Sequence, residues 1–199
     1  MLWSATMTDK RIAKIKHVAS LRRKDLVVVL IDLFDPHNAA AIFRTCESFG
    51  VQDVYLVFEN EKVFDPKKIG KKSSSSANKW LDFHAFTNIE ECIGKLKTRG
   101  FTVVGSVLSE KAEKIGEYIW PKKTALLLGN EHSGLSIQTI KKCDKHVYIP
   151  MCGMIQSLNV SVAAGILIAD LCGKRKESKK CHFTTQEQGI LVSSFMKRK

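Results

Sequence analysis

The segment Val147–Asp170, VYIPMCGMIQSLNVSVAAGILIAD, combines a short apolar run, a polar loop and a long apolar stretch. The loop follows Pro150, and the long stretch opens at Ser157 or Asn159, residue types that suit a helix N-cap. Its apolar residues then recur at helical spacing. A strand, a loop and a helix start therefore meet at one point, which is a common architecture for a ligand site. A buried strand–helix pair with an ordinary loop would give the same pattern.

The charge of the chain is strongly positive, because 32 Lys and Arg stand against 20 Asp and Glu. A protein this basic often binds a polyanion, most often nucleic acid, and an anionic membrane surface is the rival partner. The length of 199 residues and the 44% hydrophobic content predict one domain with a real core and an appended tail. No run is long enough for a transmembrane helix, and the N-terminus lacks the apolar core of a signal peptide. We therefore expect a cytoplasmic protein with no membrane partner.

The six cysteines contain no C-x-x-C pair and lack the ligand spacing of a zinc site. We expect reduced thiols and no metal. Cys152 lies in the polar loop, but no His stands near it in the sequence to activate it as a nucleophile.

Residues 1–25 are basic and mildly amphipathic, which predicts a helix that docks on the rest of the chain. Their cations could face a phosphate backbone, and a solvated charged surface is the alternative. The near-continuous apolar run Leu26–Leu33 is typical of a strand buried on both faces of a parallel sheet.

The break after that strand predicts a helix start. Asn38 suits the N-cap of a helix over Ala39–Phe49, and Gly50 ends it. Arg44 lies less than two turns after Asn38, so we expect both to border one cleft at the carboxyl end of the strand, where ligands gather in open α/β sheets. A surface ion pair is the alternative role for Arg44.

The rest of the chain alternates apolar runs with helical patterns, which predicts a mostly parallel sheet with helices on both faces. No G-x-G-x-x-G follows the first strand, and no Walker A motif is present, so a dinucleotide fold or a P-loop enzyme is unsupported. The polar, lysine-rich segment 59–79 is either a loop that grips RNA or a plain surface loop. The expected strands are 53–58, 80–86, 101–107 and 124–128, and the expected helices are 89–99 and 137–142.

Three separated stretches carry a family resemblance. The first is Pro36–Gly50, PHNAAAIFRTCESFG, which places an Asn before an Arg on one helix. The second is Leu127–Gly134, LLGNEHSG, which is a glycine-bracketed turn with a Glu. The third is Ile149–Ala164, IPMCGMIQSLNVSVAA, the polar loop and the helix start described above. Together they resemble the SpoU/TrmH RNA 2'-O-ribose methyltransferases of the SPOUT superfamily. The resemblance covers the chain from the N-terminal helix to residue 172, and the most similar members act on the D-loop guanosine of tRNA.

This resemblance implies an α/β fold, a mostly parallel sheet flanked by helices, with a C-terminal deep trefoil knot. It implies a methyltransferase domain at 26–172 between a basic N-terminal helical segment, 1–25, and a basic C-terminal tail, 173–199. It also implies S-adenosylmethionine as cofactor and a homodimer with its active site at the subunit interface. The expected substrate is tRNA, and rRNA or a non-catalytic RNA-binding role are the alternatives.

The resemblance also implies roles for individual residues. Arg44 is a poor base, so we expect it to bind a phosphate and to stabilise the developing alkoxide of the ribose. One departure is the segment Ser75–Trp80, in which serines replace the glycines that tRNA-specific members often carry. The expected catalytic residues are Arg44, Asn38, Glu131, Ser157 and Asn159; the cofactor-binding residues are Ser106, Gly129, Asn130, Glu131, Ile149, Met151, Leu158 and Asn159; the RNA-binding residues are Arg11, Arg22, Arg23, Lys67, Lys68, Lys71, Lys72 and Lys79.

Overall fold

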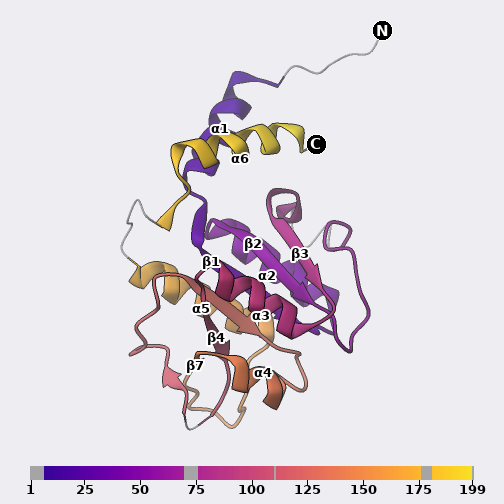
Figure 1. Cartoon of the computed structure of the whole chain (residues 1–199), viewed down its shortest axis with the longest axis vertical. Helices are drawn as coiled ribbons and strands as arrows, with labels where there is room; N and C mark the ends of the chain where they lie inside the picture. Colours follow the sequence, from indigo (N-terminus) through magenta and orange to yellow (C-terminus); the bar gives the residue numbers. More distant parts are fainter. Residues whose placement is uncertain (1–6, 70–75, 110, 176–180, 199) are drawn as a thin grey trace.

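The computed structural model describes residues 7–69, 76–109, 111–175 and 181–198. Within these residues strands and helices alternate along the chain, as the apolar runs predict (Figure 1). The strands are β1 Arg23–Ile31, β2 Val51–Val57, β3 Asp82–Phe86, β4 Thr102–Ser106, β5 Glu113–Lys114, β6 Thr124–Leu128 and β7 Lys145–Tyr148. The helices are α1 Asp9–Ser20, α2 Pro36–Ser48, the 3-10 turn η1 Ala77–Trp80, α3 Ile89–Thr98, α4 Ile137–Lys142, α5 Val160–Lys174 and α6 Thr185–Lys197.

The strands of the described part form one sheet in the order β3-β2-β1-β6-β4-β7-β5, and every neighbouring pair is parallel. All carboxyl ends therefore lie at the same edge of the sheet, which we call the carboxyl edge. The loops that follow β1, β4, β6 and β7 all leave from this edge. The predicted α/β class with a mostly parallel sheet is confirmed, and β3 lies at one end of the strand order.

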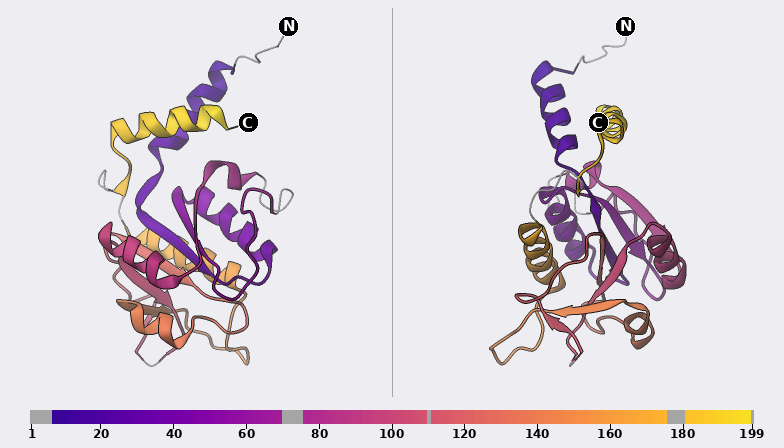
Figure 2. Two further views of the ribbon diagram at one scale, coloured as in Figure 1. Left: turned by 45° about the vertical axis from the view of Figure 1, so that its right-hand side comes forward. Right: turned by 60° about the vertical axis from the view of Figure 1, so that its left-hand side comes forward.

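Helices cover both faces of the sheet (Figure 2). Alternate residues of β1 point to opposite faces: Val28 and Leu30 pack with α2 and α5, while Val27 and Val29 pack with α3. This burial on both faces explains why β1 is apolar without alternation. Each fully buried aliphatic side chain contributes about 1.5–3 kcal/mol.

The terminal helices pack against each other beyond the amino ends of the strands, away from the carboxyl edge (Figure 1). Ile15 and Ala19 of α1 contact Leu191 and Phe195 of α6 in a small separate core. The last part of the basic segment 173–199 is thus a 13-residue helix with a capping box, which is longer than the small last element that the sequence indicates over residues 189–195. Its apolar residues include Ile190, Leu191, Val192 and Phe195, and of these Leu191 and Phe195 are buried.

The start of α2 also differs from the expectation. Asp35, and not Asn38, caps this helix, because the Asp35 side chain accepts from His37 N at 2.8 Å and Pro36 occupies the first turn. The side chain of Asn38 is therefore free to make other contacts. The N-terminal segment differs as well, since α1 ends at Ser20 and β1 already begins at Arg23.

None of the helices in the described part of the chain has the length and apolar character that crossing a membrane requires.

Candidate active site

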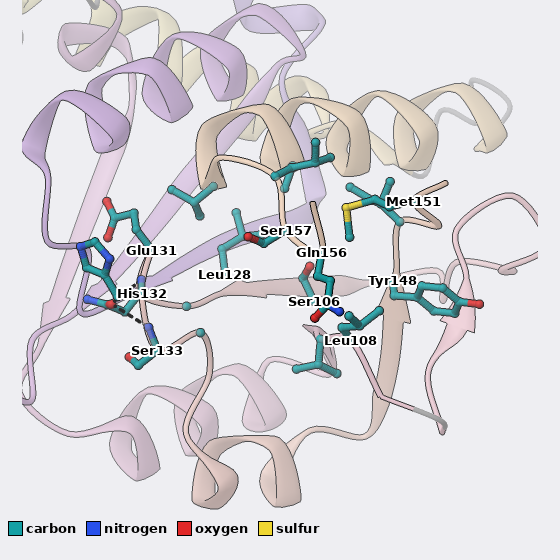
Figure 3. A pocket seen from close by; sticks show the side chains of 18 residues that line it. Ser106, Leu108, Leu128, Glu131, His132, Ser133, Tyr148, Met151, Gln156 and Ser157 are labelled. Atoms are coloured by element: carbon teal, nitrogen blue, oxygen red, sulfur yellow. Dashed lines mark hydrogen bonds between the residues drawn. The ribbon is translucent and has the colours of Figure 1, made fainter. Parts of the chain in front are cut away.

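A cavity of about 460 Å³ opens at the carboxyl edge (Figure 3). We call it the edge cavity. The loops after β4, β6 and β7 and the start of α5 line it, and in Figure 3 Glu131 and Met151 lie toward opposite ends. Its size is within the range of small-molecule sites. Most of the expected cofactor residues line it: Ser106, Gly129, Asn130, Glu131, Ile149, Met151 and Leu158, together with Ser157.

The turn after β6 is held tightly closed. Asn130 N donates to Gly134 O at 3.1 Å, and Gly134 N donates to Asn130 O at 2.9 Å. A Cβ on Gly129 would lie 2.3 Å from the Gly134 backbone, so only glycine fits there. The Asn130 side chain accepts from His132 N and Ser133 N, which fixes the rest of the turn. The edge cavity thus has one wall of rigid backbone.

Glu131 accepts three hydrogen bonds from the β1–α2 loop and the first turns of α2. The donors are Phe34 N at 2.9 Å, Asp35 N at 3.2 Å and Asn38 Nδ2 at 2.8 Å. Burial raises the pKa of the Glu131 carboxyl, but the hydrogen bonds from Asn38, Phe34 and Asp35 outweigh it and hold that pKa below its usual value. Glu131 therefore accepts these hydrogen bonds in its ionised form.

Asn159 joins the third motif to this group. Its side-chain oxygen caps α5 by accepting from Ser161 N at 2.8 Å, and its Nδ2 donates to Asn38 Oδ1 at 3.0 Å. Asn159 therefore contacts Asn38 and does not line the edge cavity itself. The residues Asn38, Glu131 and Asn159 come from three distant parts of the chain and form one hydrogen-bonded network.

Arg44 lies elsewhere. It is exposed on α2 and lines a second cavity of about 630 Å³, between α1, α2 and α6, with Arg11, Lys14 and Trp80. The expectation that Asn38 and Arg44 border one cleft is therefore not met within one chain. The reason is helical geometry: six residues advance about 9 Å along the helix and leave the two side chains about 120° apart around its axis.

The expected RNA-binding residues divide into buried and exposed groups. Arg22 is fully buried, with Nη2 2.9 Å from Glu47 Oε1 and Nη1 3.1 Å from Val51 O. Arg23 is buried too, and it forms two hydrogen bonds with Asp25. Both are internal structural cations, so their assignment to RNA is wrong; charge alone does not reveal burial. Arg11, Lys67, Lys68 and Lys79 are exposed, and Lys71 and Lys72 lie outside the described residues.

Two further cations, Lys197 and Arg198, lie beside Lys67 and Lys79, and the sequence did not single them out. Lys67 and Lys79 line a cavity of about 380 Å³ with Lys197 and Arg198 at the end of α6. Arg198 is held in place by Asp82 Oδ1 at 2.6 Å. Lys197 and Arg198 are far from Lys67 along the chain, so no local pattern in the sequence places them next to it.

Among the described residues, no group of three or more His, Cys, Asp and Glu side chains is arranged to hold a metal ion.

The chain is similar to known proteins over most of its length. The model of the SpoU rRNA Methylase family matches residues 25–169. A curated tRNA (guanosine(18)-2'-O)-methyltransferase of Aquifex aeolicus is 34% identical over 177 residues, 89% of this chain and 82% of the relative. The crystal structure of an A. aeolicus TrmH/SpoU tRNA modifying enzyme superposes with a TM-score of 0.82 at 30% identity, covering 94% of this chain and 95% of the other.

A second solved structure is a SpoU methyltransferase, AviRb from Streptomyces viridochromogenes, in complex with the cofactor AdoMet. It has a TM-score of 0.67 at 26% identity and covers 77% of this chain and 61% of that one. The family model spans the sheet and all three loops of the edge cavity. The chain therefore belongs to the SpoU rRNA methylase family.

Proposed function

We propose that this chain transfers a methyl group from S-adenosylmethionine to the ribose 2'-OH of guanosine 18 in tRNA. The observation that carries the proposal is the meeting of the three family motifs at the carboxyl edge. The second and third motifs line the edge cavity, and Asn38 of the first motif is hydrogen-bonded to Glu131 and Asn159. The A. aeolicus relative supports the choice of tRNA, since it matches most of this chain and is named for that nucleotide.

The edge cavity suits S-adenosylmethionine. Ile149, Met151 and Leu158 offer apolar surface for an adenine ring, and the closed turn after Gly129 offers backbone N–H and C=O groups for its polar edge. When bound, the cofactor supplies a methyl group on a cationic sulfur. The leaving thioether is neutral, so alignment of the two reactants does most of the work, and the chemistry needs no metal.

Arg44 is the proposed group that meets the RNA. A guanidinium stays protonated, so it binds a phosphate beside the target ribose and stabilises the developing alkoxide. Asn38, Glu131 and Asn159 fix the loops, and Ser157 lies at the cavity wall. Because Arg44 lines a different cavity from Glu131, a complete site needs Arg44 from a second chain.

A homodimer is the proposed source of that second chain. The segment from the polar loop into α5 exposes a run of apolar side chains that a monomer would leave in water. Met154 is fully exposed and Ile155 is 74% exposed, and Val162 on α5 is half exposed. Helix α5 is apolar on all sides, as expected for a helix with sheet on one side and a partner on the other.

The remaining expectations rest on the family. A deep trefoil knot is proposed for the segment that runs from β7 through the polar loop to α5, with the methyltransferase unit at 26–172. The resemblance of fold to the A. aeolicus enzyme supports it. A cytoplasmic location goes with a tRNA substrate.

The test is a methyl-transfer assay with labelled S-adenosylmethionine on unmodified tRNA and rRNA side by side, followed by identification of the labelled nucleoside. We expect 2'-O-methylguanosine at position 18 of tRNA. Label in rRNA alone would favour the second candidate, an rRNA methylase, which the family's name supports. Cofactor binding without transfer to either RNA would contradict both and leave an RNA-binding role.

A further inference from the structure

Asp32, the residue after β1, has an unusual backbone. Its φ is 49°, and Ser76 is the other non-glycine residue with positive φ in the described part of the chain. This left-handed conformation costs an ordinary residue energy, and Asp tolerates it better than most. The Asp32 N–H still pairs with Val57 O at 2.9 Å, so the strand turns sharply only after this bond.

The buried Asp32 carboxylate holds the loop that follows β2. Its Oδ1 accepts from Glu59 N at 2.7 Å, Asn60 N at 3.0 Å and Glu61 N at 3.2 Å, and its Oδ2 accepts from Asn60 Nδ2 at 2.8 Å. A carboxylate that accepts several N–H bonds is firmly fixed. Glu59 extends the chain of contacts, because its side chain accepts from Ile89 N at the start of α3.

The backbone carbonyl of Asp32 faces the opposite way, toward the site. It accepts from Asn130 Nδ2 at 2.7 Å. The side-chain oxygen of Asn130 accepts from His132 N and Ser133 N and so shapes the turn that contains Glu131. Two and three residues after Asp32, Phe34 N and Asp35 N donate to Glu131. The β1–α2 loop is thus bound on one side by the loop after β2 and on the other by the turn after β6.

We propose that Asp32 is a positioning residue for methyl transfer: its left-handed backbone and its buried carboxylate fix the β1–α2 loop, and with it Asn38, against Glu131. This inference rests on the proposed function. It assigns Asp32 no contact with substrate or cofactor. The carboxylate acts through the loop, and small misplacements of a positioned group reduce rates by up to about 100-fold.

Two substitutions distinguish the effect of the Asp32 carboxylate from the effect of its backbone conformation. Asp32→Gly keeps the left-handed conformation and removes every side-chain hydrogen bond. Asp32→Asn keeps the conformation and one acceptor oxygen, so the three backbone N–H groups of residues 59–61 still find a partner. We expect Asp32→Gly to lower kcat about 10-fold or more with the Kd for S-adenosylmethionine within about 3-fold, and Asp32→Asn to recover most of the loss.

Asp53→Asn is the matched control. Asp53 is a partly buried carboxylate with two charged partners, Arg99 at 2.9 Å and His84 at 3.1 Å, but it lies early in β2, away from the carboxyl edge. We expect it to lower the melting temperature and to leave kcat per cofactor-binding site within about 2-fold of the wild type. A kcat for Asp32→Gly that is equally unaffected would overturn the proposal.

Hydrogen exchange tests the positioning without relying on catalysis. The amides of Phe34 and Asp35 are bonded to Glu131, so Asp32→Gly should speed their exchange at least about 10-fold, and Asp53→Asn should not. If the wild type methylates neither RNA, the proposed function fails, and the exchange result still decides whether Asp32 holds the loop. Unchanged exchange in Asp32→Gly would reject that role whatever the activity.

Discussion

Asn38 and Glu131 lie 93 residues apart in the chain, yet Asn38 Nδ2 donates a 2.8 Å hydrogen bond to Glu131 Oε1. The same amide accepts a 3.0 Å bond from Asn159 Nδ2 through its oxygen. One side chain therefore uses its donor and its acceptor to join three loops at the carboxyl edge. No residue of the same shape that lacks either group can satisfy both partners.

Asn38→Asp tests this relationship, because it keeps the shape and replaces the donor by a second carboxylate beside Glu131. We expect kcat to fall about 100-fold and the free energy of unfolding to fall by about 1–3 kcal/mol. Single-turnover methyl transfer and urea denaturation measure the two effects. Asn88→Asp is the control, since Asn88 caps α3 and Asp caps equally well. Wild-type kcat in Asn38→Asp would show that the bond has no part in catalysis.

Gly129→Ala should abolish binding of S-adenosylmethionine. The added Cβ would lie 2.3 Å from the Gly134 backbone, and the turn that lines the edge cavity must open to admit it. Calorimetric titration with the cofactor measures the effect. Gly116→Ala, where a Cβ meets nothing within 4 Å, should bind as the wild type does. If Gly129→Ala binds normally, the cofactor does not use this turn.

The sequence predicted the sheet well because β1, β2 and β6 are apolar on both faces, and that pattern depends on burial alone. It predicted many residues of the edge cavity, because the second and third motifs fall on the loops after β6 and β7 that line it. It failed where a choice depends on tertiary contacts: Asp35 and Asn38 both suit a cap, and only the position of Pro36 decides between them.

The sequence also failed where position along the chain does not imply proximity. Arg22 and Arg23 look like Arg11, but the chain enters the sheet at Arg23, soon after the end of α1, and both side chains are buried. Asp32 carries no motif at all. Its role depends on a backbone angle and on contacts with a loop 27 residues away, which no local pattern encodes.

Arg22→Ala should reduce stability and leave RNA binding unchanged. Its loss leaves Val51 O without its guanidinium donor and Glu47 without its cation, which costs about 2 kcal/mol or more. Arg11→Ala removes an exposed cation. It should leave the stability unchanged and lower both the RNA affinity and the slope of its salt dependence. Urea denaturation and filter binding at several salt concentrations distinguish the two. A lower salt slope in Arg22→Ala would return that residue to the RNA surface.

Acid should weaken the attachment of α6. The Lys24 ammonium, 2.9 Å away, and the N–H of Thr184 lower the pKa of Glu187 from 4.5 to about 2. A depressed carboxyl pKa stabilises the fold above pH 4.5, and this contribution is lost as the pH falls toward 2. The melting temperature of the wild type should therefore exceed that of Glu187→Gln near neutral pH and converge with it in acid. A difference that is constant with pH would exclude this linkage.

The separation of Arg44 from Glu131 predicts complementation between two inactive variants. Arg44→Ala should abolish transfer and spare cofactor binding, because Arg44 does not line the edge cavity. Gly129→Ala should be inactive because it should not bind the cofactor. If each site takes Arg44 from one chain and the cavity from the other, a mixed dimer contains one intact site. Equal mixing after unfolding and refolding should then restore about a quarter of the wild-type activity, since half of the dimers are mixed and each has one of two sites intact. A site built within one chain would leave every mixture inactive, because each chain would carry one defect.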